Sequence, residues 1–272
     1  MNGERMKDGK DTRSALQFII GTSGYSFTDW VGSFYPPDLP KDRMFAYYAE
    51  RFRTVELNFT YYRMPTEGMM RRFAQTSPAG FTFWVKANQE TTHKANRDAA
   101  APFREAMEPL EAAGKLGGVL LQFPQAFHRT VDNRKYLDAT LTDLAGLPLA
   151  VEFRHGSWSV PPTTNGLAKR DVTLVVPDVP PVPNLYRTAA TATTSTGYLR
   201  LHSRNAANWY GGGALRYDYT YSDDELRRVA ADWTDPALGV QQVFAFFNNC
   251  HRGQAAANAQ RFEEIVADIL GT

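Results

Sequence analysis

Eight short apolar segments recur along the chain, and their number and spacing constrain the fold more than any other feature. Each is rich in Val, Phe, Ile and Leu and has the length of a buried strand rather than of a helix. Segments with helical periodicity lie between most of them, such as residues 40–52 and 254–270. The eight are FIIGTS at 18, TVELNF at 54, FTFWVKA at 81, GVLLQF at 118, LAVEFR at 149, VTLVVPD at 172, YLRLHS at 198 and VFAFFNN at 243.

Strands that alternate with helices predict βα units joined into a parallel sheet. Eight strands are the number that closes a (β/α)8 barrel, whereas an open doubly wound sheet often carries a Gly-rich phosphate turn after its first strand. GTSGYS at 21–26 is not that turn. Residues 178–197 contain too many prolines and β-branched residues for a regular helix. We therefore predict an α/β fold, a TIM-barrel-like (β/α)8 barrel whose helix 6 is short or missing.

The chain reads as one domain. Its 272 residues suit a single barrel, and no linker divides them. We expect residues 1–16 to form a flexible N-terminal tail and residues 17–272 to form the barrel. The tail lacks the apolar run of a secretion signal, and no stretch of about 18 apolar residues predicts a membrane span. With Cys250 as the single cysteine there is no disulfide framework, so we expect a cytoplasmic protein without membrane partners.

The charge balance argues against a general affinity for polyanions. Lys and Arg number 30 against 29 Asp and Glu, so no global field attracts nucleic acid or an anionic membrane. Any affinity for negative charge must come from a local group of side chains.

Strand parity predicts where the polar side chains lie. Successive side chains of a strand face opposite sides, so one set meets the helices and the other fills the barrel. Where the apolar set faces the helices, as Val151 and Phe153 do, their polar neighbours Glu152 and Arg154 face inward. The same parity on strand 6 groups Val176 with Asp178. The predicted inward set is Glu56, Asn58, Lys86, Gln122, Glu152, Arg154, Asp178, Arg200 and His202.

Most of these side chains come at the ends of their strands, where barrel enzymes keep their chemistry. His155 follows strand 5, and Asn248 and Asn249 end strand 8. Buried charges are rare unless they are paired. The set therefore indicates either a functional pocket or a buried network of ion pairs, for example Glu152 with Arg200.

Seven blocks of the sequence, in order, resemble the domain of unknown function 72 family, also called YecE-like. They are GTSGYSFTDWVGSFYP, TVELNFTYYRMP, GFTFWVKANQETTHK, KLGGVLLQFPQAF, AVEFRHGSW, YLRLHS and VFAFFNN with AAANA after it, within residues 18–265. The resemblance implies a TIM-barrel-like fold and supplies no catalytic residues. Where the family often has NND, this chain has Asn248, Asn249 and Cys250, and a cysteine does not replace a carboxylate as a ligand for a hard cation.

The inward groups favour an enzyme, a hydrolase, lyase or isomerase, acting on a small anionic substrate, phosphorylated or carboxylated, by acid/base chemistry. Its expected partner is therefore a small anionic ligand. The candidate catalytic residues are Glu56, Glu152, Asp178 and His202. The candidate substrate-binding residues are Asn58, Lys86, Gln122, Arg154, His155, Arg200, Asn248 and Asn249.

Two alternatives stay open. Glu56, Glu152, Asp178 and His202 supply the atoms that a divalent metal prefers, as in a metal-dependent hydrolase or isomerase, although no motif such as HExxH identifies a metal or another cofactor. The second alternative is a binding module without catalysis, whose loop aromatics stack on single-stranded nucleic acid. The neutral charge balance disfavours nucleic acid. The candidate aromatics are Tyr25, Phe27, Trp30, Tyr61, Tyr62, Trp158, Trp209 and Tyr210.

Overall fold

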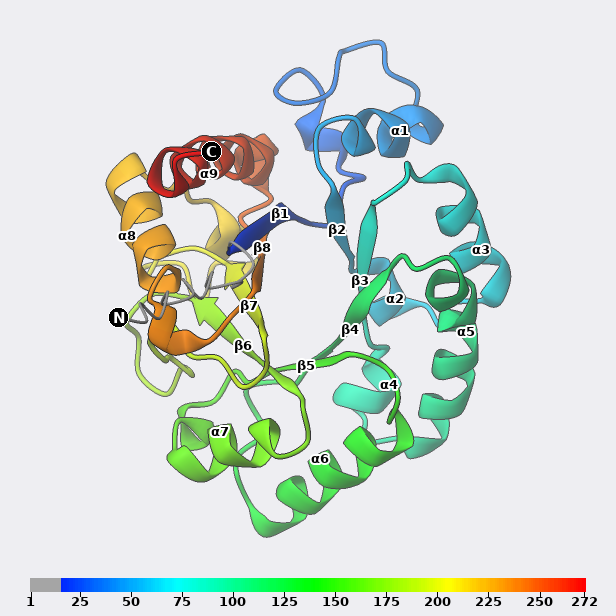
Figure 1. Cartoon of the computed structure of the whole chain (residues 1–272), viewed down its shortest axis with the longest axis vertical. Helices are drawn as coiled ribbons and strands as arrows, with labels where there is room; N and C mark the ends of the chain where they lie inside the picture. Colours follow the sequence, from blue (N-terminus) through cyan, green and yellow to red (C-terminus); the bar gives the residue numbers. More distant parts are fainter. Residues whose placement is uncertain (1–15) are drawn as a thin grey trace, which may run out of the picture.

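A closed barrel of eight parallel strands forms the centre of the molecule (Figure 1). The computed structural model describes residues 16–272, so the predicted tail, apart from its last residue, lies outside the described residues. The strands pair in sequence order, and β8 closes the barrel against β1. They are β1 (Gln17–Ser23), β2 (Thr54–Leu57), β3 (Thr82–Lys86), β4 (Leu116–Gln122), β5 (Leu149–Glu152), β6 (Thr173–Asp178), β7 (Thr196–Leu201) and β8 (Gln242–Phe247).

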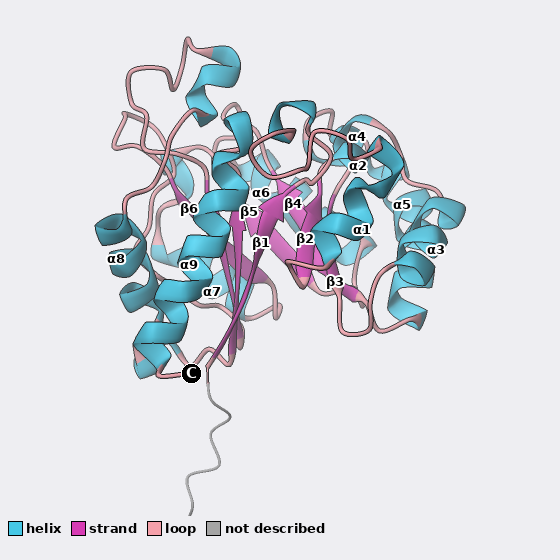
Figure 2. Ribbon diagram, turned by 90° about the horizontal axis from the view of Figure 1, so that it is seen from above, coloured by secondary structure: helices cyan, strands magenta, loops and turns pink. Residues whose placement is uncertain are grey.

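Helices surround the strands, as Figures 1 and 2 show. One barrel helix follows each strand except β6, and the short α2 and α4 come directly after β2 and β3. The helices are α1 (Met44–Ala49), α2 (Phe59–Tyr62), α3 (Glu67–Thr76), α4 (Gln89–Thr92), α5 (Ala100–Ala112), α6 (Val131–Asp143), α7 (Pro161–Ala168), α8 (Asp223–Trp233) and α9 (Gln254–Leu270).

The predicted gap in the helical ring is confirmed. Residues 179–195, all of them described, contain no helix, only irregular backbone with turns, bends and an isolated β-bridge between Leu185 and His155. Their prolines lack the N–H that a helix needs, and their threonines bond the neighbouring backbone instead. For example, the Thr193 hydroxyl donates to the Val172 carbonyl at 2.6 Å and accepts from the Leu174 N–H at 2.8 Å.

Local signals fix the ends of several helices. Thr66 caps α3, because its hydroxyl accepts from the Met69 N–H. Ser222 begins α8 with a capping box in which its hydroxyl accepts from the Glu225 N–H while the Glu225 carboxylate accepts from the Ser222 N–H. The predicted final helix is α9, Gln254–Leu270. No helix among the described residues is long and apolar enough to cross a membrane.

The barrel has two apolar layers that meet at the strands. The larger one packs the helices onto the outer faces of the strands and includes Val55, Leu57 and Val151. The smaller one fills the barrel interior and contains Trp84, Leu120, Ala150, Val175, Tyr198, Phe244 and Phe246. The charged residues Glu56 on β2, Glu152 on β5 and Arg200 on β7 lie next to this interior apolar layer, towards the carboxyl ends of the strands.

Candidate functional site

A buried arginine on β7 joins carboxylates from two other strands. Arg200 is 1% exposed, and its Nη2 donates to Glu56 Oε1 at 2.6 Å, while its Nη1 donates to Glu152 Oε2. Both carboxylates are fully buried. Burial opposes charge on the Arg200 guanidinium, but Glu152 and Glu56 outweigh it and raise its pKa. Glu152 and Arg200 thus form the buried ion pair that the sequence analysis named as the alternative to a functional pocket.

Both carboxylate oxygens of Glu56 accept further hydrogen bonds. Tyr198 donates its hydroxyl to Glu56 Oε2 at 2.6 Å, and Asn58 Nδ2 donates to Oε1 at 3.0 Å. Burial and the Glu56 charge raise the pKa of Tyr198 well above its usual value, so its proton stays on the phenol. Glu56 thus accepts three hydrogen bonds and lies within the network that fixes β2 to β7.

Glu152 is held ionised by its neighbours. Arg154 Nε lies 2.6 Å from Glu152 Oε1, and His202 Nε2 lies 3.0 Å from the same oxygen. Burial alone would raise the pKa of the Glu152 carboxyl, but Arg154 and Arg200 hold it well below its usual range. A carboxyl with so low a pKa is a poor general acid at neutral pH.

His202 is neutral, and its tautomer follows from its contacts. Burial, with the Arg154 charge next, lowers its pKa to about 3. Its Nε2–H then donates to Glu152, and its Nδ1 accepts from Asn248 Nδ2 at 2.8 Å. Asn248 thus follows the interior parity of β8 and fixes the imidazole.

Lys86 differs from Arg200 and Arg154 in having no carboxylate partner among the described residues. It ends β3 and donates from Nζ to Gln122 Oε1 at 2.9 Å, and the ammonium lies 4.5 Å from the centroid of the Tyr61 ring. Among residues 16–272 it forms no ion pair with a carboxylate, since Glu56 and Glu152 are already taken up by Arg200 and Arg154. Burial and then the Arg200 charge lower the pKa of Lys86 to about 7.

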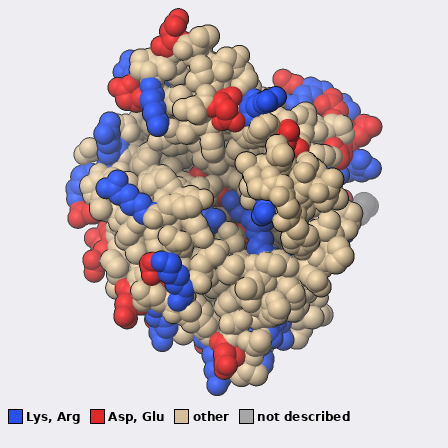
Figure 3. Space-filling view, turned by 180° about the vertical axis from the view of Figure 1, so that it is seen from behind, with Lys and Arg blue, Asp and Glu red and all other residues tan. Residues whose placement is uncertain are grey.

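Arg154 brings a second cation to the same region. Its side chain is 15% exposed, and Nε faces Glu152. Within the described part of the chain, its two terminal amino groups form no hydrogen bond, and Nε, although close to Glu152 Oε1, is not in hydrogen-bond geometry with it. Burial, followed by the charges of Lys86 and Arg154, lowers the pKa of the half-buried His93 to about 4. Figure 3 shows a central hollow on the face opposite to that of Figure 1, with Lys and Arg atoms on its floor.

Sequence parity missed His93, which lies in a loop. It follows α4, directly beyond the end of β3, where the segment ETTHK continues from the strand that carries Lys86. Its Nδ1 is 2.9 Å from the Thr92 hydroxyl, and its ring packs against Tyr61 with centroids 4.9 Å apart. The position just after a barrel strand was the one signal for it.

The predicted inward position of Asp178 is wrong. In the β6–β7 register Val175 pairs with Tyr198 and Pro177 pairs with Arg200, so these two face the interior and Asp178 faces the helices. There Asp178 accepts from Arg204 Nε at 2.9 Å and from the Tyr221 hydroxyl at 2.9 Å. This ion pair joins β6 to the loop before α8, away from Arg200.

Two further candidate residues have their side chains bound outside the network. Asn249 is buried and donates from Nδ2 to the Tyr219 carbonyl at 2.8 Å and to Asn258 Oδ1 at 2.9 Å, which joins β8 to α9. His155 caps a short turn by accepting from the Ser157 N–H, and its ring stacks on His128 with centroids 3.9 Å apart.

The four side chains considered as metal ligands do not form one cluster. Glu56 and Glu152 each pair with Arg200, His202 bonds Glu152, and Asp178 lies on the outer side of the barrel wall. Within residues 16–272 there is no group of three or more His, Cys, Asp or Glu side chains that could hold a metal ion.

Most of the loop aromatics pack onto the barrel. Trp30, Trp158 and Trp209 are at most 2% exposed. Tyr62 and Tyr210, at 76% and 59%, are the exposed large aromatic side chains of the described chain. Of the eight candidate aromatics, these two therefore have the most ring surface exposed for stacking on a base.

Comparisons with known proteins agree with this architecture. A family model described as "Protein of unknown function DUF72" matches residues 19–270. The UPF0759 protein YunF of Bacillus subtilis (strain 168) is 30% identical over 274 residues, which cover 91% of this chain and 94% of that protein.

Two solved structures extend the comparison. A DUF72 family protein of Thermotoga maritima MSB8 is similar with a TM-score of 0.85 and 36% identity, over 92% of this chain and 99% of that chain. A DUF72 family protein of Enterococcus faecalis V583, at 24% identity, shares the fold with a TM-score of 0.81 over 92% and 95% of the two chains. None of these names states a ligand or a reaction.

Proposed function

The chain belongs to the DUF72 family of proteins of unknown function, and from the geometry of its barrel mouth we propose that it is an enzyme acting on a small anionic substrate. The substrate is a carboxylate or a phosphate ester that binds between Lys86 and Arg154. One arrangement supports the proposal, because it brings both cations to the carboxyl ends of nearby strands. Lys86 donates to Gln122 at 2.9 Å, Gln122 pairs in register with Glu152, and Arg154 Nε lies 2.6 Å from Glu152 Oε1.

Charge balance supports an anion at this position. Glu56 and Glu152 carry two negative charges, and Arg200 and Arg154 carry two positive ones. A protonated Lys86 adds a positive charge for which no described carboxylate remains. A bound carboxylate or phosphate would neutralise this charge, and the planar Arg154 guanidinium is suited to bidentate contact with either group.

The proposal reassigns the roles that the sequence suggested. Glu56, Glu152 and Arg200 are proposed to position Arg154 and His202 rather than to react, because their polar atoms are engaged with one another. Lys86 takes the place of the carboxylates as the proton-transfer group. Its pKa of about 7 matches the range in which a general acid or base works best near neutral pH.

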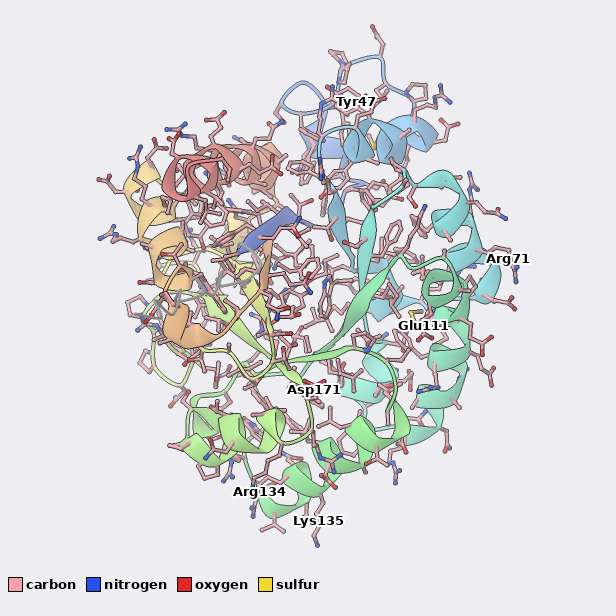
Figure 4. The ribbon with its side chains drawn as sticks, viewed as in Figure 1. Tyr47, Arg71, Glu111, Arg134, Lys135 and Asp171 are labelled. Atoms are coloured by element: carbon pink, nitrogen blue, oxygen red, sulfur yellow. The ribbon has the colours of Figure 1, made fainter. Side chains whose placement is uncertain are left out.

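Thermal unfolding in the presence of sulfate, phosphate and oxalate tests the proposal. We expect at least one of these anions to raise the melting temperature of the wild type, and R154Q to lose most of that increase, because the amide cannot replace the guanidinium charge. R134Q is the matched control, since Figure 4 shows Arg134 on the outer side of α6, away from the barrel. Equal stabilisation of wild type, R134Q and R154Q would contradict the proposal.

A further inference from the structure

We propose that Lys86 forms a covalent imine with the carbonyl carbon of a small substrate whose acid group is bound by Arg154. This inference rests on the proposed function and deepens it, because it names the substrate class. The substrate would be an oxo acid or a phosphorylated ketone, in which a carbonyl and an anionic group belong to one small molecule.

The surroundings of Lys86 leave its nitrogen available to react. Its one side-chain hydrogen bond to residues 16–272 is to the neutral amide of Gln122, and the face of Tyr61 covers another side. Lys115 shows the contrasting case, because its Nζ donates to the Ala74 carbonyl and to both Ser77 oxygens at 2.7 to 2.8 Å. Lys115 is held as a structural cation, whereas Lys86 faces the barrel mouth with donor capacity to spare.

Burial, helped by neighbouring cations, keeps part of Lys86 unprotonated. Burial disfavours the ammonium most, the charges of Arg200 and Arg154 act in the same direction, and those of Glu152 and Glu56 oppose them in part. Only an unprotonated amine is a nucleophile, and desolvation near other cations is a general way to obtain one at neutral pH. A pKa of about 7 provides a substantial fraction of neutral amine at neutral pH.

Arg154 determines which carbonyl compounds would react. Its amino groups bind the acid group, and this contact holds the carbonyl carbon beside Nζ. An aldehyde or ketone without an acid group lacks this contact. The acid group also compensates the charge that the iminium carries, so the local charge balance is better with the adduct than with the free ammonium.

The step needs no reactant other than the carbonyl compound and water. The Lys86 nitrogen forms a bond to the carbonyl carbon, and the π electrons move to the carbonyl oxygen, which takes up the proton lost from nitrogen. The hydroxyl of the resulting carbinolamine takes up a proton from solvent and leaves as water, while the nitrogen keeps its remaining hydrogen, so the product is a protonated C=N bond. Water added back across that bond releases the amine and the carbonyl compound unchanged and returns the proton to solvent.

Reductive trapping tests the inference. The wild type is incubated with pyruvate or with dihydroxyacetone phosphate and sodium cyanoborohydride, and the labelled lysine is identified by peptide mass spectrometry. We expect label at Lys86 with at least one probe, and about tenfold less in R154Q, the effect of losing one charge-assisted contact. Preference for pyruvate or for the phosphate ester distinguishes the two sources of the acid group.

Two variants of Lys86 and one control make the result decisive. K86M and K86R both remove the nucleophile, and K86R keeps the charge in case K86M does not fold. K135M removes an exposed lysine of α6 that Figure 4 places on the outer side of the molecule, and it is expected to label as the wild type does. Label spread evenly over surface lysines, or no label above that of K86R, overturns the inference.

The failures of the two proposals remain distinguishable. If no label forms while sulfate or phosphate still stabilises the wild type through Arg154, the imine is refuted and the anion site stands. If the anions also stabilise R154Q as well as the wild type, both proposals fail.

Discussion

At the scale of single residues, Arg200 places the strictest demand on the barrel, because it is a charge with almost no access to water. It is compensated by Glu56 on β2 and Glu152 on β5, so three strands contribute to one ion network. Such a network adds little stability compared with apolar packing, but the loss of one partner leaves buried charge uncompensated. The network therefore fixes the positions of Arg154 and His202. Replacing one of its members is expected to lower the stability of the fold strongly.

We predict that R200M destabilises the protein by about 3 to 5 kcal/mol, because Glu56 and Glu152 then remain buried without their shared partner. Urea unfolding followed by circular dichroism measures the change. R97Q breaks an exposed pair with Asp143 and is expected to leave the unfolding midpoint nearly unchanged. Equal losses in both variants would refute the view that burial makes the Arg200 network critical.

Lys86 provides a prediction for pH dependence. Its folded pKa of about 7 lies below the value of about 10.4 for an unfolded lysine. The folded state therefore binds fewer protons between these values, and the stability of the wild type relative to K86M should rise as the pH increases from about 7 to about 10. Below pH 7 both states are protonated, so the difference should level off.

Unfolding free energies of wild type and K86M across this pH range provide the measurement. Other titrating groups are present in both proteins and cancel in the difference. A difference that stays constant between about pH 7 and 10 would show that the pKa of Lys86 is not lowered on folding.

Residue-level prediction succeeded where the two faces of a strand differ in polarity. Glu152 and Arg154 alternate with Val151 and Phe153, and the structure places both charged groups in one ion pair toward the barrel interior. On β6 the segment TLVVPD is apolar on both faces, so alternation could not tell which side Asp178 occupies. Apart from the pair of Glu152 with Arg200, the partners of the buried groups could not be predicted from the sequence, since they depend on the register between strands.

At the scale of elements, the close contact between β7 and α8 fixes the position of the strand that carries Arg200 and is followed by His202. Gly197 on β7 faces the Trp233 ring of α8, and a Cβ at this glycine would lie 2.4 Å from that ring. Trp233 is 1% exposed and has little room to move. The glycine thus permits α8 to approach the strand.

We predict that G197A destabilises the protein by about 1 to 3 kcal/mol through overpacking against Trp233. The matched control is G166A in α7, where an added Cβ meets nothing within 4 Å. Alanine at an open helical position should be neutral or should stabilise by about 0.5 to 1 kcal/mol. Thermal unfolding of both variants checks the pair, and a G197A protein as stable as G166A would contradict the packing argument.

Element prediction from the sequence was reliable because the barrel repeats one simple unit. Each of the eight apolar segments coincides with a strand, and the segment 254–270, in which the sequence shows helical periodicity, forms α9. The short α2 and α4 were not foreseen, because four residues carry too little periodicity to identify a helix. Tyr61 on α2 lies against Lys86, and His93, which follows α4, packs against Tyr61.

At the scale of the whole molecule, the barrel separates stability from chemistry. Apolar side chains such as Trp84 and Tyr198 fill the interior, and the polar groups gather at one end of the strands. The fold is shared with relatives whose names state no activity, so it cannot identify a reaction. The claim for function depends on Lys86 and Arg154 forming one anion site.

Crystals soaked in selenate test that claim most directly, because the anomalous signal of selenium locates the anion. The account predicts a peak between Nζ of Lys86 and the guanidinium of Arg154 in the wild type, and no peak there in R154Q. Methionine remains unlabelled, so any selenium signal belongs to the anion. A wild-type peak only at surface arginines, such as Arg43 and Arg72 beside the groove between α1 and α3, would contradict it.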